Sequence, residues 1–274
     1  MATDLHRMDG RVVIVTGGSQ GLGEAAAMLL RERGVAGLVL VGRDQAKGEA
    51  TAARLTGDGC RAVFVPADMS DASACADVIA RTDAAFGVVH GVVNAAASTG
   101  RGTVWDTTAA LWDDMFAVNV RAPFLIMQGA ARLMVREGVA GSMVTIGSMS
   151  GHGGQPFLTA YCASKGALQA LTRNFAYSVM RDRVRVNLLN LGWMDTPAEH
   201  AIQTGFHGAP ADWLVAAEAG QPMGRLIKVD EAARTICFLL SDESGLMTGT
   251  ILDYDQSVLG AGDAQKPPPE LHHP

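Results

Sequence analysis

Short apolar runs rich in Val, Ile and Leu alternate along this chain with longer segments of helical periodicity. The runs that predict strands are Arg11–Thr16, Leu38–Gly42, Ala62–Pro66, Gly91–Asn94, Ser142–Gly147 and Val184–Leu189. Helical segments follow the first five runs, at Gly21–Arg33, Asp44–Leu55, Asp71–Phe86, Ala109–Glu137 and Thr159–Arg181. Such alternation forms βαβ units with right-handed crossovers, which build a parallel sheet with helices on both faces. The pattern therefore predicts an α/β fold of the Rossmann type, a doubly wound sheet of about seven strands.

The regular alternation stops after the sixth run. Residues 194–224 hold three prolines and four glycines, and we expect them to form a small mobile substrate lobe above the strand ends. Further elements are predicted at Ala198–Gln203, Asp212–Ala219 and Val229–Ser241 (helices) and at Thr250–Tyr254 (strand). The interpretation is a single domain over residues 1–263, followed by a Pro-rich extended tail at 264–274.

Composition narrows the class of protein. Hydrophobic residues make up 48% of the 274 residues and aromatic residues only 5%, as expected for a Val/Leu-rich buried sheet under Ala-rich helices. The net charge of −6 argues against nucleic acid as a partner, because phosphate binding needs a basic face. No N-terminal run is long enough to cross a membrane or to serve as a signal peptide.

The cysteines and histidines point to neither disulfides nor metal. The four cysteines are scattered without a CxxC pair, at Cys60, Cys75, Cys162 and Cys237. We expect them to be reduced thiols in a cytoplasmic protein. The seven histidines show no metal-ligand spacing, so no metal site is predicted.

A glycine-rich turn follows the first predicted strand, in the order Thr16-Gly17-Gly18-Ser19-Gln20-Gly21-Leu22-Gly23. Glycines there let the backbone approach a pyrophosphate, which the N-terminus of the next helix attracts. Ordinary strand–helix turns also use glycine, but this one lies between a first strand and an amphipathic helix. We therefore predict a dinucleotide site formed by Gly17, Ser19, Gln20, Gly21, Leu22 and Gly23.

The second strand ends in Val41-Gly42-Arg43-Asp44, where a Rossmann-type site usually places the group that reads the adenosine ribose. No carboxylate ends the strand, and the Arg43 guanidinium can pair with a 2′-phosphate. NADP is therefore favoured over NAD. In the alternative, Arg43 only stacks on adenine while Asp44 caps the next helix.

Tyr161 and Lys165 are four residues apart on a predicted helix, so both side chains can face one site. A free phenol has a pKa of about 10, and a pKa of about 7 requires about 4 kcal/mol of preferential phenolate stabilisation. A nearby lysine and an oxidised nicotinamide ring can supply it. This spacing alone is common in helices, and Ser148 at the end of the fifth predicted strand makes it specific.

With these residues the chain resembles the short-chain dehydrogenase/reductase family, in its single-domain form, from about Met8 to Tyr254. The family's TGxxxGxG turn is matched by Thr16–Gly23, its adenine-contacting acid by Asp68, and its NNAG strand end, imperfectly, by Asn94-Ala95-Ala96-Ala97. The catalytic tetrad is matched by Asn119, Ser148, Tyr161 and Lys165. Further cofactor contacts are expected from Met69, Asn94, Gly192, Met194 and Thr196.

The resemblance implies a role for each tetrad residue. Tyr161 exchanges a proton with the substrate oxygen, and Ser148 donates a hydrogen bond to that oxygen. Lys165 holds the nicotinamide ribose and lowers the pKa of Tyr161. Asn119 distorts its helix and anchors a water in a proton path. The family also implies a homotetramer built on the helices at 109–137 and 159–181.

Three departures from the family pattern affect loops rather than these groups: Ala97 in place of glycine, Leu191 in place of proline, and Tyr254-Asp255-Gln256-Ser257 in place of VDGG. His152 and Gln155 could bind hydroxyls of a sugar, polyol or cyclic secondary alcohol, with Trp193 as an apolar platform. In the alternative, His152 is a solvated loop residue and the aromatic side chains pack the lobe. A non-catalytic NAD(P)-binding regulator, or a scaffold, on the same fold remains the competing function.

Overall fold

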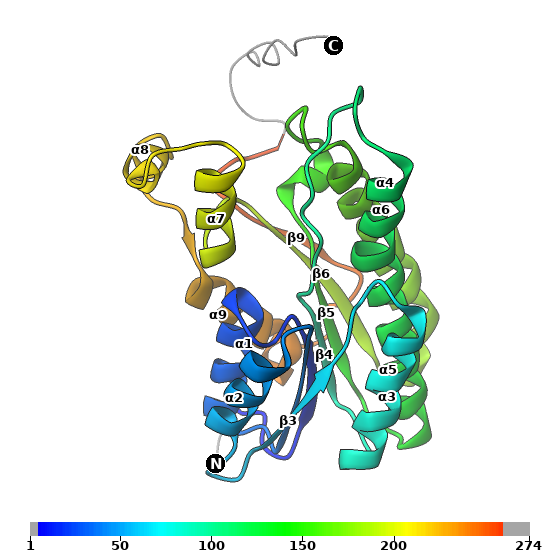
Figure 1. Cartoon of the computed structure of the whole chain (residues 1–274). Helices are drawn as coiled ribbons and strands as arrows, with labels where there is room; N and C mark the ends of the chain where they lie inside the picture. Colours follow the sequence, from blue (N-terminus) through cyan, green and yellow to red (C-terminus); the bar gives the residue numbers. More distant parts are fainter. Residues whose placement is uncertain (1–4, 260–274) are drawn as a thin grey trace.

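The computed structural model describes residues 5–259, and the predicted tail at 264–274 lies outside them (Figure 1). Its main sheet has seven parallel strands in the order β3-β2-β1-β4-β5-β6-β9. These strands are β1 (Val12–Thr16), β2 (Gly37–Gly42), β3 (Arg61–Pro66), β4 (Gly91–Asn94), β5 (Ser142–Ile146), β6 (Arg185–Leu191) and β9 (Ile251–Tyr254). The Rossmann-type sheet expected from the sequence is thereby confirmed.

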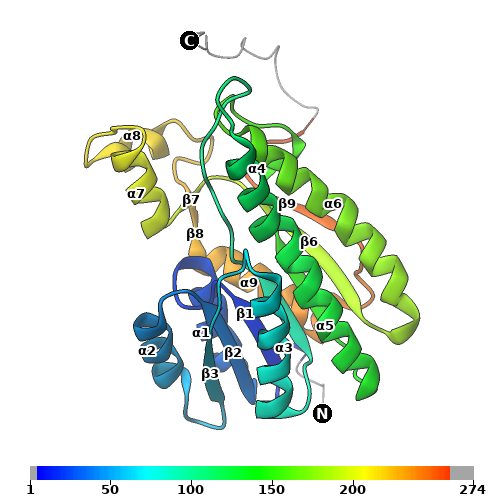
Figure 2. The same ribbon diagram turned by 45° about the vertical axis from the view of Figure 1, so that its right-hand side comes forward.

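Helices cover both faces of the sheet (Figures 1 and 2). One face carries α1 (Gly21–Glu32), α2 (Gln45–Leu55) and α9 (Val229–Leu240), and the other carries α3 (Ala72–Phe86), α5 (Ala122–Arg136) and α6 (Thr159–Val179). Successive strand residues point to opposite faces, so Val13 and Val15 join the first core and Ile14 joins the second. Since both faces are buried, the strands are continuous apolar runs without polar alternation.

The helix predicted over 109–137 is not continuous. It is divided into α4 (Ala109–Phe116) and α5 by a π-helical turn at Ala117–Arg121. Two features explain the wider turn. Pro123 in the first turn of α5 has no N–H to donate, and Asn119 directs its side chain into contacts outside the helix.

The segment after β6 forms a small lobe, and Figure 1 shows its helices α7 (Pro197–Gly205) and α8 (Trp213–Ala219) together at one end of the molecule. A short parallel pair of strands, β7 (Met194–Asp195) and β8 (Ile227–Lys228), joins the lobe to α9. Lys228 Nζ lies 2.9 Å from an Asp195 carboxylate oxygen and 2.8 Å from one of Glu218, and these ion pairs fasten α8 to the strand pair. No helix between residues 5 and 259 is long and apolar enough to cross a membrane.

Candidate active site

The turn between β1 and α1 leaves no room for side chains at two of its glycines. Gly17 has a φ of +68°, and a Cβ there would lie 3.0 Å from the Ala96 backbone nitrogen. A Cβ on Gly23 would lie 2.3 Å from the Gly17 carbonyl oxygen. The bare backbone at the start of α1 can therefore approach a pyrophosphate closely, and these residues fit a dinucleotide.

Cationic side chains gather where the adenosine end of a dinucleotide would lie. Arg43 is exposed after β2. Asp68 accepts hydrogen bonds from the backbone and hydroxyl of Ser70, and these bonds, with the nearby positive charge of Arg43, lower the pKa of Asp68. Lys47, on the first turn of α2, donates from Nζ to Gln20 Oε1 over 3.0 Å. Sequence reasoning missed Lys47, although it lies four residues after Arg43 and, like it, carries a positive charge.

Asp44 caps α2, because its side chain accepts from the Lys47 backbone N–H at 3.0 Å. This is the capping role that the alternative interpretation of the Arg43-Asp44 pair assigned to it. The Asp44 cap does not involve the Arg43 guanidinium. Arg43 can therefore either pair with a 2′-phosphate or stack on adenine.

The β5–α6 connection brings the serine and the tyrosine together. Ser148 follows β5, and its side chain lies near that of Tyr161 on α6. Burial raises the pKa of the Tyr161 hydroxyl, and hydrogen bonding to the Ser148 side chain opposes this effect. Without cofactor, Tyr161 is therefore protonated at neutral pH and can donate its proton. The lowered pKa expected from the sequence is not found in the chain by itself, and it would require the positive charge of an oxidised nicotinamide.

Lys165 lies one turn after Tyr161 and is only 3% exposed. Its Nζ donates to the Ile146 carbonyl oxygen at 2.7 Å and lies 5.5 Å from the centre of the Tyr161 ring. Burial lowers the pKa of Lys165 to about 8. A buried ammonium with one acceptor keeps donors for a further partner, such as a ribose hydroxyl.

Asn119 fixes the loop after β4 against α6. Its Oδ1 accepts from the Ser98 backbone N–H at 2.8 Å, and its Nδ2 donates to the Ser98 carbonyl at 2.9 Å and to Ser164 Oγ at 3.1 Å. Ser164 is the neighbour of Lys165 on α6. The asparagine in the π-turn thus joins the β4–α4 loop to the helix that carries the tyrosine and the lysine.

Sequence reasoning missed Asn190, a fully buried residue near the end of β6. Its Oδ1 accepts from the Ser148 backbone N–H at 3.1 Å, and a Cβ on Gly147 would lie only 2.1 Å from that oxygen. Its Nδ2 contacts His152 Nε2 at 3.1 Å and Asp253 Oδ1 at 2.8 Å. A polar residue inside an apolar strand was the available signal for this positioning role.

Replacing Asn190 with alanine should lower kcat/KM about tenfold or more, because the Ser148 backbone loses its acceptor and the serine its fixed position. Asn187→Ala is the matched control. Asn187 is equally buried in β6, but it bonds to the Met247 carbonyl and the Thr250 N–H, away from Ser148. Both variants should lose stability in urea unfolding. If Asn187→Ala reduces turnover of the folded enzyme as much as Asn190→Ala does, the positioning role is wrong.

The other residues predicted to contact the cofactor have the following places in the fold. Thr196 caps α7 by accepting from the Glu199 N–H at 3.1 Å, and Met69 is buried in the core. A Cβ on Gly192 would overlap the Asp255 carboxylate, which would have to move aside. Asn94 donates to Thr145 Oγ1 at 3.3 Å, and its buried Oδ1 has no partner. Met194 forms β7.

The three predicted substrate residues differ in their surroundings. His152 Nε2 lies 3.0 Å from Asp253 Oδ1, so its ring is engaged at β9. Trp193 stacks on Trp213 with 5.8 Å between ring centres, and its Nε1 donates to Glu199 Oε1 at 2.8 Å. Gln155 is exposed in the loop before α6. The tryptophans therefore pack the lobe, as the alternative interpretation held, while Trp193 still exposes one part of its surface.

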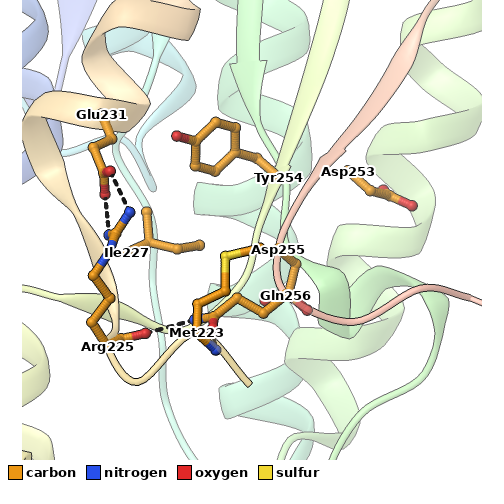
Figure 3. Close-up of a pocket in the computed structure, with 8 residues that line it drawn as sticks. All are labelled: Met223, Arg225, Ile227, Glu231, Asp253, Tyr254, Asp255 and Gln256. Carbon is orange, nitrogen blue, oxygen red and sulfur yellow. Dashed lines mark hydrogen bonds and ion pairs between the residues drawn. The ribbon is translucent and has the colours of Figure 1, made fainter. Parts of the chain in front are cut away.

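A pocket of about 250 Å³ lies between the lobe and the end of β9 (Figure 3). Arg225 forms two 2.7 Å contacts with the Glu231 carboxylate at its wall, and Gln256 Nε2 donates to the Arg225 carbonyl at 2.6 Å. Tyr254 and Asp255 also line the pocket. The segment that replaces the family's terminal VDGG motif therefore forms part of its wall. None of the four tetrad residues lines this pocket.

Known proteins of similar sequence and structure define the family. A family model described as enoyl-(acyl carrier protein) reductase matches residues 17–257. The chain is 34% identical to 2-(S)-hydroxypropyl-CoM dehydrogenase 3 of Xanthobacter autotrophicus, over 91% of this chain and 97% of that protein. It is also 34% identical to cis-4-hydroxycyclohexanecarboxylate dehydrogenase of Sinomonas cyclohexanicum, over 89% and 95%.

The solved structure of a short-chain type dehydrogenase/reductase from Mycobacterium ulcerans superposes with a TM-score of 0.82 at 28% identity, covering 91% of this chain and 90% of that one. The chain belongs to the short-chain dehydrogenase/reductase family. It is an NAD(P)-dependent oxidoreductase that acts on CH–OH groups.

Proposed function

We propose that this enzyme moves a hydride between NADP(H) and a secondary alcohol or ketone, with Tyr161 as the acid/base. The observation that carries the proposal is that Ser148 and Tyr161 lie near each other, with the buried ammonium of Lys165 5.5 Å from the centre of the Tyr161 ring. The bound nicotinamide supplies the hydride chemistry, and the protein supplies position and charge. A panel of ketones with NADPH and of alcohols with NADP, followed by nicotinamide absorbance, tests it. A regulator of the same fold would bind the cofactor and turn over nothing.

The chain's own groups account for the proton transfer. In reduction, Tyr161 donates its proton to the carbonyl oxygen, while the Ser148 hydroxyl donates a second hydrogen bond to the same oxygen. In oxidation, the phenolate accepts the proton of the alcohol. Lys165 holds the ribose of the nicotinamide and favours the phenolate by its charge. Asn119 keeps the loop after β4 in place beside these groups.

The preference for NADP rests on Arg43 and Lys47, two cations at the adenosine end of the site. Arg43→Ala should weaken NADP(H) binding by about 10- to 100-fold and leave NAD(H) binding almost unchanged, because a charge-assisted pair with the 2′-phosphate is lost. Fluorescence titration with both cofactors measures this. Arg54→Ala, which removes an exposed arginine of α2 paired with Glu24, is the control. Tighter binding of NAD(H) by the wild type would contradict the preference.

For the substrate, we propose a cyclic secondary alcohol or the corresponding ketone. The similar protein from Sinomonas cyclohexanicum is named for a hydroxylated cyclohexane ring. The exposed part of Trp193, held by its stack on Trp213, offers an apolar surface on which such a ring can lie. A sugar or polyol is the second candidate, and Gln155 is the side chain for its hydroxyls.

We also propose a cytoplasmic homotetramer. All four cysteines are free, as in a reducing compartment. A groove of about 640 Å³ runs along α4, the π-turn, the start of α5 and α6, lined by Trp112, Asp113, Phe116, Ala117, Val120, Arg121, Phe124 and Leu171. Apolar and aromatic side chains on the surface of the helices expected to pack against a second copy support this assembly.

Trp112→Glu should dissociate the tetramer, because it places a charge in this groove. Light scattering at micromolar concentration measures the mass, and Trp105→Glu, at another exposed tryptophan, is the control. A wild-type protein that is only monomeric under these conditions would rule the assembly out.

A further inference from the structure

The loop between β4 and α4 carries Arg101, a residue that the proposed mechanism does not use. Its neighbour Gly102 pairs with the chain before α6: the Gly102 N–H donates to the Phe157 carbonyl at 3.0 Å, and its carbonyl accepts from the Thr159 N–H at 3.1 Å. Tyr161 follows two residues later. These backbone bonds hold Arg101 next to the start of the helix that carries the proton-transfer group.

The guanidinium of Arg101 has few partners in the protein. Its Nη1 donates to the Thr99 carbonyl, while its Nε is buried and has no hydrogen-bond acceptor. Among the residues 5–259, every ion pair that involves an arginine is formed by an arginine other than Arg101. Buried N–H groups in proteins are nearly always paired, so this one, beside the proposed reaction site, is a donor that a ligand can satisfy.

Charge also connects Arg101 to the reacting hydroxyl. Burial has the largest effect on the pKa of Tyr161 and raises it; the Ser148 hydrogen bond and the positive charge of Arg101 lower it, and the carboxylate of Glu199 raises it. Arg101 and Glu199 therefore act on Tyr161 from two different elements. Glu199 Oε1 already accepts from Trp193 Nε1 at 2.8 Å and from Gln203 Nε2 at 2.7 Å. Of the two charged groups, Arg101 is the one that has no side-chain hydrogen-bond or ion-pair partner.

We propose that Arg101 binds a carboxylate of the substrate, so that the enzyme acts on secondary alcohols or ketones that carry a carboxylate. A guanidinium presents Nε–H and Nη–H groups in a planar fork that matches the two oxygens of a carboxylate. Anchored there, the substrate places its hydroxyl or carbonyl carbon toward Tyr161 and Ser148. This inference rests on the proposed function, since it names the substrate class of the same site.

The test compares 4-oxocyclohexanecarboxylate with 4-oxocyclohexanecarboxamide, which differ in charge but little in shape. With NADPH, the wild type should show a kcat/KM about 10- to 100-fold higher for the carboxylate, mainly through a lower KM. Arg101→Gln should abolish this preference, and Arg101→Lys should keep part of it. Arg234→Gln, at an exposed arginine of α9 paired with Asp230, should keep the wild-type ratio. The ratio cancels any effect of Arg101 on Tyr161 that both ketones share.

Binding separates this inference from the proposed function. Calorimetric titration of the cofactor-saturated protein with cyclohexanecarboxylate and cyclohexanecarboxamide requires no turnover. Tighter binding of the carboxylate by the wild type, lost in Arg101→Gln, supports the inference even if neither ketone is reduced, and only the proposed function then fails. Equal affinity for the two compounds in the wild type, or an Arg101→Gln variant that folds and keeps the carboxylate preference, overturns it.

Discussion

Tyr161→Phe should reduce kcat by about 10²- to 10⁴-fold, the contribution of a positioned proton-transfer group. The change removes one oxygen and leaves the packing of α6 almost unchanged, so thermal unfolding and cofactor titration should match the wild type. Tyr177→Phe is the matched control, because Tyr177 lies on the same helix and is 80% exposed. Near-wild-type turnover by Tyr161→Phe, with loss of turnover in His152→Ala, would move the proton transfer to the histidine.

The protonation of Tyr161 also sets the direction of the pH dependence. Burial raises the pKa of its hydroxyl, so the protonated form that reduces a ketone predominates at neutral pH. Alcohol oxidation requires the phenolate and should accelerate with rising pH. An oxidised nicotinamide nearby lowers the pKa again by its positive charge. Profiles of kcat for both directions measure this dependence, and Tyr161→Phe should lose it.

Lys165→Met should separate activity from stability. Turnover and cofactor affinity should each fall by about 10- to 100-fold, because a charged hydrogen-bond donor to the ribose is lost. The free energy of unfolding at pH 7 should not fall and should rise by up to about 2 kcal/mol, since the variant buries no charge. The lost bond to the Ile146 carbonyl limits this gain.

The pH dependence of stability checks the cause. Burial lowers the pKa of Lys165 from 10.5 to about 8, so between these pH values the unfolded chain binds a proton that the folded chain does not. The stability of the wild type relative to Lys165→Met should therefore increase as the pH rises from 8 to about 10. Urea unfolding of both proteins across this range measures it. A variant less stable than the wild type at pH 7 would show that the ammonium is well solvated or paired in the fold.

Much of the fold could be predicted from local pattern. Strands buried on both faces are continuous apolar runs, and each predicted strand of the main sheet is present within two residues of its expected bounds. The carboxylates of Asp44 and Asp71 account for the starts of α2 and α3, since each caps its helix. The apolar periodicity predicted one continuous helix over 109–137, and only the family resemblance, through the distortion it implied at Asn119, pointed to the interruption. Of its two causes, Pro123 is visible in the sequence, while the pairing of Asn119 with Ser98 is a tertiary contact.

The residues of the candidate site also differ in whether a local sequence signal or a long-range contact places them. The glycine turn and the tetrad residues proposed for this site have fixed local spacing or a strand end as a signal, so they could be proposed from the sequence. Asn190 and Arg101 are harder to find, because their partners depend on contacts between segments far apart in the chain. Asn190 meets Ser148 across 42 residues, and Arg101 reaches α6 only through the pairing of Gly102 with Phe157. In both cases a polar group in an apolar or buried setting is the feature to look for.

Isotope transfer tests the central claim most directly. The protein is mixed with a cyclic ketone and NADPH that carries deuterium at C4 of the nicotinamide, and the product alcohol is analysed by mass spectrometry and NMR. Hydride transfer predicts one deuterium on the carbinol carbon, on a single face, with an equal loss of reduced nicotinamide. If the cofactor binds but neither a carboxylated nor a neutral ketone acquires deuterium, and no secondary alcohol is oxidised with NADP or NAD, the account of an oxidoreductase is contradicted.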